Sequence, residues 1–202
     1  MPRLLKAYLD TNILIEYIWI TSFATEERKT SAYTLVNRGA RGEYEIYISY
    51  YTIVEVSQHF IDYFLQQKAI KRGFSFREFP RVRRNFTLTE EEIRTISDIV
   101  EILRTNVYLN YIHPVEIEGE FFRILMEYVR GCIDFMDALH LRTAIDVGCD
   151  YFVTKDGELR KRIQYLINEK VITEPIKVTS VSGFLNILNI RKKQLETRKE
   201  KS

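Results

Sequence analysis

The chain has 202 residues, 46% of them hydrophobic, a length that suits one sizeable core and is short for two domains. Thirty basic and 28 acidic residues give a net charge of +2, so the overall charge does not indicate a nucleic-acid partner. Two cysteines are too few for a disulfide framework or a zinc ribbon, and no apolar run is long enough to predict a transmembrane helix.

The first third of the chain alternates short apolar runs, typical of buried strands, with stretches at helical spacing. Asp10 ends the first apolar run and precedes a helical pattern, so we expect it where a strand ends. Gly39 and Gly42 are expected to end a charged helix. The predicted elements are a strand at 4–9, a helix from 11, a charged helix at about 25–38, a strand at 44–49 and a helix at 51–67.

Residues 68–87 interrupt this alternation with Gly, Pro and seven Lys or Arg, and we interpret them as part of an insertion over about 66–106. Within it, Thr89 and Glu92 have the spacing of a capping box that opens an amphipathic helix. The basic side chains could hold RNA phosphates, although a solvated surface or a protein contact explains them nearly as well. The candidate RNA-binding residues are Lys71, Arg72, Arg81, Arg83 and Arg84.

The second half of the chain returns to alternating strands and helices. Strands separated by helices predict one α/β domain over 1–190, with a parallel sheet covered on both faces. The tail at 191–202 is charged throughout and is predicted to be frayed or disordered. The predicted elements are a strand at 107–112, helices at about 116–129 and 134–147 with Gly148 as the stop, a strand at 150–154, a helix from about 157, a strand at 176–180 and a helix at 182–190.

Four acidic residues are expected to meet at one edge of this sheet, because ligands of parallel α/β sheets collect beyond the carboxyl ends of the strands. Asp10 and Asp156 closely follow predicted strands, Glu55 lies in the helix after the second strand, and Asp137 lies near the start of a helix. Unit charges about 4 Å apart repel by roughly 4 kcal/mol at an effective dielectric near 20, so protons or a cation must join them. Mg²⁺ or Mn²⁺ suits such oxygen ligands and can assist phosphodiester hydrolysis.

Each acid also has an ordinary structural explanation. Asp10 could cap a helix, Asp156 could be a turn residue, and Glu55 alone would be a surface glutamate. Asp134, one helical turn before Asp137, is interpreted as a helix cap or an auxiliary acid. Structural or surface roles are expected for the three histidines, which lack metal-ligand spacing: His59, His113 and His140.

Three segments, in this order, resemble the PIN-domain ribonucleases, including the VapC-type toxins: DTN at 10–12, the lone Glu55, and DALHLRTAIDVGCDYFVTKD at 137–156. The resemblance implies a PIN fold, with a parallel sheet of about five strands between helices and a divalent metal, Mg²⁺ or Mn²⁺, held by acids. The insertion and the extra acid, Asp134, depart from the compact family pattern. Carried over, the four metal and catalytic residues are Asp10, Glu55, Asp137 and Asp156, with Asn12 and Thr154 as supporting polar residues.

The same resemblance implies a metal-dependent endoribonuclease that leaves a 5′-phosphate and a 3′-hydroxyl. Its leading role is the toxin of a VapBC-type pair, a cytoplasmic homodimer with an RNA substrate and a VapB-type antitoxin. The insertion also allows a housekeeping RNA-processing nuclease, whereas the two cysteines argue against zinc-ribbon relatives. A non-catalytic RNA- or protein-binding module is the alternative from another class. A phosphotransfer domain is disfavoured because the first strand ends in DTN and lacks a DxD motif.

Overall fold

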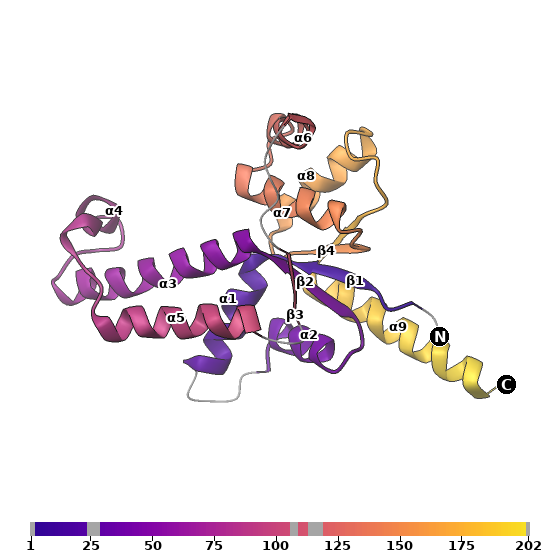
Figure 1. The fold of residues 1–202 in the computed structure, drawn as a ribbon, viewed down its shortest axis with the longest axis horizontal. Helices are drawn as coiled ribbons and strands as arrows, with labels where there is room; N and C mark the ends of the chain where they lie inside the picture. The colour runs from indigo at the N-terminus through magenta and orange to yellow at the C-terminus, as the bar shows by residue number, and fades with distance from the viewer. Residues whose placement is uncertain (1–2, 24–28, 106–108, 113–118, 201–202) are drawn as a thin grey trace. The chain divides into compact units, whose positions relative to one another are not determined.

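The computed structural model describes residues 3–23, 29–105, 109–112 and 119–200, and Figure 1 draws its elements. The chain divides into two compact units. Residues 1–51 and 107–202 form the first, which we call the sheet unit, and residues 52–106 form the second, which we call the helical unit.

A five-stranded parallel sheet organises the sheet unit, in the order β3-β2-β1-β4-β5. Ala7 in the central strand pairs with Ile46 on one side and with Tyr151 on the other. Strand order reverses at this point, since the chain passes from β1 to β2 on one side and reaches β4 on the other only later. The strands are β1 (Lys6–Leu9), β2 (Glu45–Ser49), β3 (Leu109–Ile112), β4 (Tyr151–Val153) and β5 (Lys177–Thr179).

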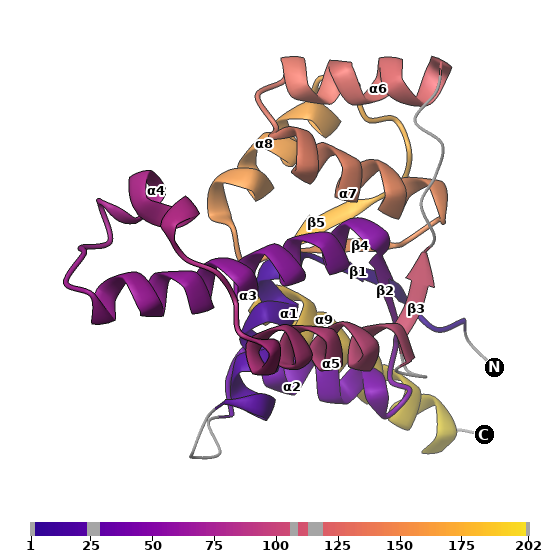
Figure 2. The same cartoon turned by 60° about the vertical axis from the view of Figure 1, so that its left-hand side comes forward.

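Helices cover both faces of the sheet, as the sequence predicts for a three-layer α/β fold. Figure 2 shows α1, α2 and α9 on one face and α6, α7 and α8 on the other. Contacts of α2 with α1 and α9, and of α7 with α6, β2 and β4, give the same arrangement. The helices are α1 (Thr11–Ser22), α2 (Ser31–Ala40), α6 (Gly119–Arg130), α7 (Phe135–Asp146), α8 (Gly157–Asn168) and α9 (Val181–Glu200).

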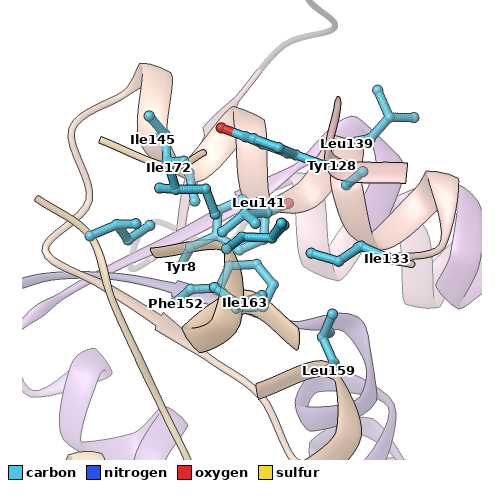
Figure 3. Close-up of a cluster of buried hydrophobic side chains, with 14 of the residues drawn as sticks. Tyr8, Tyr128, Ile133, Leu139, Leu141, Ile145, Phe152, Leu159, Ile163 and Ile172 are labelled. Carbon is cyan, nitrogen blue, oxygen red and sulfur yellow. The ribbon is translucent and has the colours of Figure 1, made fainter. Parts of the chain in front are cut away.

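An apolar cluster on the α7 and α8 face holds these helices on the sheet, as Figure 3 shows. Tyr8 and Phe152, from the adjacent strands β1 and β4, stack with ring centroids 5.6 Å apart. Leu141 and Ile163 come from the two helices and are fully buried. Full burial stabilises each aliphatic side chain by about 1.5–3 kcal/mol, so this cluster fixes α7 and α8 against the strand ends.

The helical unit has its own small core, formed by Leu65, Ala69, Phe79 and Phe86. The predicted capping box is confirmed: Thr89 N–H donates to Glu92 Oε2 at 2.7 Å, and Glu92 N–H donates to Thr89 Oγ1 at 3.2 Å. The unit comprises most of α3 (Tyr50–Lys71), α4 (Phe79–Val82), the 3₁₀ helix η1 (Arg83–Asn85) and α5 (Glu90–Thr105).

The predicted bounds of the second helix were wrong. The helix α2 starts after the cap Thr30, whose hydroxyl accepts from Tyr33 N–H at 3.3 Å. Gly39 lies inside the helix, where an added Cβ would come within 2.3 Å of Ile46 Cδ1, so the glycine allows β2 to approach. Gly42, with φ of +76°, follows the helix, as the sequence predicts. The expected residues 25–28 lie outside the described residues.

The prediction of a frayed tail was also wrong, because α9 continues to Glu200. Lys, Arg, Gln, Leu and Glu are good helix formers, so a charged tail composed of them prolongs an existing helix at little cost. The Arg191 guanidinium also donates to the carbonyl oxygen of Arg3.

Four further sequence predictions fall partly or wholly outside the described residues. They are the start of the third strand at 107–108, His113, and the start of the next helix at 116–118, together with tail residues 201–202. Within the described part of the chain, no helix is long and apolar enough to cross a bilayer.

Candidate active site

Asp10 is a buried carboxylate at the carboxyl edge of the sheet. Its N–H donates to the carbonyl oxygen of Val153 at 3.0 Å, which continues the pairing of β1 with β4, and only 5% of the residue is exposed. The side chain makes no capping bond to α1, although Asp10 occupies the N-cap position. Instead, its Oδ2 accepts from Asn12 Nδ2 at 2.7 Å and from Thr154 Oγ1 at 2.5 Å. These bonds offset the cost of burying a carboxylate.

Thr154 joins the DTN and TKD segments into one hydrogen-bonded group. Its hydroxyl oxygen donates to Asp10 and accepts from Asn12 Nδ2 at 3.3 Å and from Asp156 N–H at 3.0 Å. The Asn12 side-chain oxygen accepts from Lys155 N–H at 3.3 Å. The Lys155 ammonium forms an ion pair with Glu16 on α1. Two segments 144 residues apart in sequence are therefore held together at the end of β1 and β4.

Asp156 caps α8, so it has a structural role, although the sequence suggested a turn residue at this position. Its Oδ1 accepts from Glu158 N–H at 2.7 Å and from Leu159 N–H at 3.0 Å, and the residue is exposed. Such a cap is worth about 1 kcal/mol. Capping occupies one carboxylate oxygen and fixes the orientation of the other.

A pocket of about 200 Å³ beside this cap brings several acids together. We call it the acidic pocket, and it is lined by Cys132, Ile133, Asp134, Asp137, Asp156, Glu158, Leu159 and Arg162. Asp134 caps α7 by accepting from Met136 N–H at 3.0 Å, which confirms its interpretation as a helix cap. Asp137 is half-buried in the first turn of α7. The structure thus places Asp137 and Asp156 in the lining of one pocket.

Glu55 lies near the start of α3 and is half-buried. It belongs to the helical unit, while the three aspartates belong to the sheet unit. Its participation in a site with them stays a prediction.

The donor types at the sheet edge fit a hard divalent cation, since carboxylate, hydroxyl and amide oxygens are its preferred ligands. Among the described residues, no three His, Cys, Asp or Glu side chains stand close enough to hold an ion together. Mg²⁺ usually keeps several waters and needs only one or two carboxylates. Water-mediated binding by two carboxylates is therefore compatible with this donor set.

A buried polar network lies among the strand ends, and the sequence pattern does not predict it. The Tyr8 hydroxyl is 2.6 Å from both His140 Nδ1 and Ser49 Oγ, and Thr11 Oγ1 is 3.5 Å from His140 Nε2. The network joins α7 to β1 and β2, and His140 is fully buried, which confirms its expected structural role. The only signal in the sequence was the position of His140, three residues after Asp137.

The basic residues proposed to bind RNA lie in the helical unit, and two of them have partners there. Arg72 lies over the Phe86 ring at 5.0 Å, and Arg83 pairs with Asp62 at 2.5 Å. The other three are exposed: Lys71, Arg81 and Arg84. Their binding of RNA stays a prediction.

The family is decided by a comparison with family models, in which the PIN domain matches residues 7–163. The chain belongs to the PIN domain family. Members are generally metal-dependent nucleases, and the PIN match contains all four predicted acids. Among curated proteins, none matches this chain significantly.

Proposed function

We propose that this PIN-domain chain is a Mg²⁺- or Mn²⁺-dependent endoribonuclease. The observation that carries the proposal is Asp10, a buried acid at the point where strand order reverses, which is tied through Thr154 to the loop of Asp156. A buried carboxylate at the ligand-binding edge of a parallel sheet costs stability, so a role in binding explains its position.

Asp10, Asp137 and Asp156 would hold the cation directly or through water, with Glu55 as the fourth acid that the family resemblance implies. When bound, a divalent cation supplies a Lewis acid for the scissile phosphate and makes water a better nucleophile at neutral pH. Asn12 and Thr154 hold the Asp10 carboxylate in one orientation through Oδ2. The half-buried Asp137 and the capping Asp156 present further oxygens from the acidic pocket.

Cleavage of a structured RNA tests this proposal. Purified protein is incubated with the RNA in Mg²⁺ or Mn²⁺, with and without EDTA, beside Asp10→Asn and the control Glu196→Gln. Glu196 is an exposed acid on α9, away from the lining of the acidic pocket. We expect cleavage by the wild type and by the control only when the metal is present. Cleavage that persists in EDTA or in Asp10→Asn would contradict the metal mechanism.

We also infer that the biological role is the toxin of a VapBC-type pair, with a homodimer as the assembly and a VapB-type antitoxin as the partner. Induced expression should then arrest growth, and co-expression of a small adjacent reading frame should relieve the arrest. Arrest that Asp10→Asn still causes would argue against toxicity through RNA cleavage.

The helical unit supports a second candidate, a housekeeping RNA-processing nuclease, because it adds exposed basic residues to the PIN fold. Such an enzyme would cleave a defined precursor without arresting growth. A protein that binds RNA but shows no metal-dependent cleavage would instead be a non-catalytic binding module.

A further inference from the structure

A second, larger groove of about 620 Å³ runs along α8, and its residues were not singled out in the sequence. We call it the α8 groove. One wall is a stripe of α8 at intervals of three and four residues, the spacing of a single helix face. The other wall is the segment 178–180, at the end of β5. The helical wall consists of Gly157, Arg160, Lys161, Gln164, Tyr165 and Asn168.

The lining of the α8 groove has the chemistry of a surface for single-stranded nucleic acid. Two cations, Arg160 and Lys161, stand near its start, and Tyr165 follows with 57% of its residue surface exposed. Gln164 and Asn168 add amide groups that can donate and accept hydrogen bonds. Among the described residues that line it, none is acidic. Cations that follow a phosphate backbone, combined with an aromatic ring for stacking, are the usual elements of single-strand binding.

Lys161 is available to a phosphate despite its ion pair. Its ammonium contacts Glu158 Oε1 at 2.6 Å, but both side chains are more than 70% exposed. Surface pairs of this kind contribute at most about 1 kcal/mol, so a phosphate oxygen can replace the glutamate.

The α8 groove starts at the proposed catalytic edge. Gly157 follows Asp156 directly, and Thr179 accepts the N–H of Thr154 at 3.1 Å through its carbonyl oxygen. Arg160 Nη1 donates to the carbonyl oxygen of Thr154 at 2.9 Å. From this end, the α8 wall extends for roughly 18 Å. A strand whose phosphate lies at the acids can therefore continue past Lys161 to Tyr165.

We propose that the α8 groove binds the single-stranded segment of RNA that flanks the scissile phosphate, with Lys161 on a phosphate and Tyr165 stacked on a base. This inference rests on the proposed nuclease function for its position beside the scissile bond. The binding itself does not depend on catalysis. Tyr165 is thus a specificity element that favours unpaired bases over duplex.

The experiment measures the binding of a fluorescein-labelled oligouridylate by anisotropy in EDTA, where metal-dependent cleavage cannot occur. Tyr165→Ala loses the stacking of one base, so its affinity for the oligouridylate should be roughly five- to hundredfold lower than that of the wild type. The matched variant Tyr165→Phe keeps the ring and should bind within about twofold of the wild type, because stacking needs only the aromatic face. Phe122→Ala removes an exposed aromatic residue from α6, outside the groove, and should bind as the wild type does. Circular dichroism confirms that each variant is folded.

Competition completes the test. Unlabelled duplex RNA should displace the oligouridylate from the wild type less effectively than single-stranded RNA does. The proposal is overturned if Tyr165→Ala binds the oligouridylate as tightly as the wild type does. That result would leave the groove as a protein-docking surface. The proposal is also overturned if duplex RNA competes as well as single-stranded RNA does.

The outcomes also separate the groove from the catalytic proposal. If the wild type does not cleave RNA but Tyr165→Ala loses binding, the nuclease function fails and the groove stands. If the wild type cleaves RNA and Tyr165→Ala cleaves it with an unchanged KM, the groove fails and the nuclease function stands.

Discussion

The acidic pocket and the α8 groove are lined by neighbouring residues of α8 and its cap, and these residues carry opposite charges. Asp156 and Glu158 line the pocket, while Arg160 and Lys161 line the groove. Successive residues of an α-helix point about 100° apart, so a short segment can serve two sides of a helix about 10 Å wide. The difference teaches how one element can place a proposed cation site and a proposed phosphate site close together.

The largest expected effect tests the acidic pocket. Asp137→Asn keeps the size of the side chain but removes its charge, and we expect RNA cleavage to fall at least about 100-fold, as for a lost metal ligand or catalytic donor. Asp134→Asn is the matched control, because asparagine caps a helix as well as aspartate does. Initial cleavage rates at saturating Mn²⁺ measure both. Equal losses in the two variants would show that the pocket does not distinguish the two acids.

Asp156 stands at the border between the two regions, and two substitutions separate its roles. Asp156→Asn should keep the α8 cap and lose cleavage, whereas Asp156→Ala should lose cleavage and also lower the free energy of unfolding by about 1 kcal/mol. Urea denaturation and cleavage assays measure the two effects. Full activity in Asp156→Asn would mean that Asp156 serves only as the cap.

A smaller effect concerns the charge of the α8 groove. Lys161→Gln should reduce the slope of log affinity against log salt by about 0.7, the contribution of one phosphate contact on a single strand. Tyr165→Ala should weaken binding with the slope unchanged, since stacking releases no counterion. Anisotropy titrations from low to moderate KCl give both slopes. If the slope for Lys161→Gln is unchanged or steeper than for the wild type, Lys161 does not contact an RNA phosphate.

The smallest expected effect compares a thiol in the acidic pocket with one in the core. Burial raises the pKa of Cys149 to about 12, so at pH 8 this thiol stays protonated and unreactive. Cys132 is exposed and lines the pocket. Brief treatment with iodoacetamide should therefore add one group to the native protein, and none to Cys132→Ser, by intact mass. Two additions to the folded protein would contradict the burial of Cys149.

The sequence predicted the alternating elements and the sheet well, because these depend on local pattern. Asp10 after β1 and the Thr89 capping box are set by neighbours in sequence. The sequence could not predict that Gly39 lies inside α2. A glycine is needed there because Ile46, from the strand β2, approaches the helix closely. The continuation of α9 into the tail was not predicted, because the high charge of the tail was taken to indicate disorder. Most residues of the tail nevertheless favour a helix.

The candidate site was predictable only in part, and for a related reason. Asn12 and Thr154 were expected only as supporting polar residues, and in the structure both donate hydrogen bonds to the Asp10 carboxylate. Which acids bind a metal stays a prediction. The Tyr8 and His140 network depends on tertiary contact between α7 and the strand ends, which no spacing reveals. Tyr165 was missed because an exposed tyrosine on a polar helix carries no signal until β5 supplies the second wall of the groove.

The bond between Thr154 and Asp10 also bears on when the protein can act during its synthesis. Asp10 leaves the ribosome early, but the hydroxyl that orients it and the strand that pairs with β1 are made 144 residues later. Parallel pairing across so long a stretch forms late in folding. A nascent chain that stops before β4 would lack both the Thr154 hydroxyl and the strand that pairs with β1, so the proposed RNA cleavage would begin only after β4 has been synthesised.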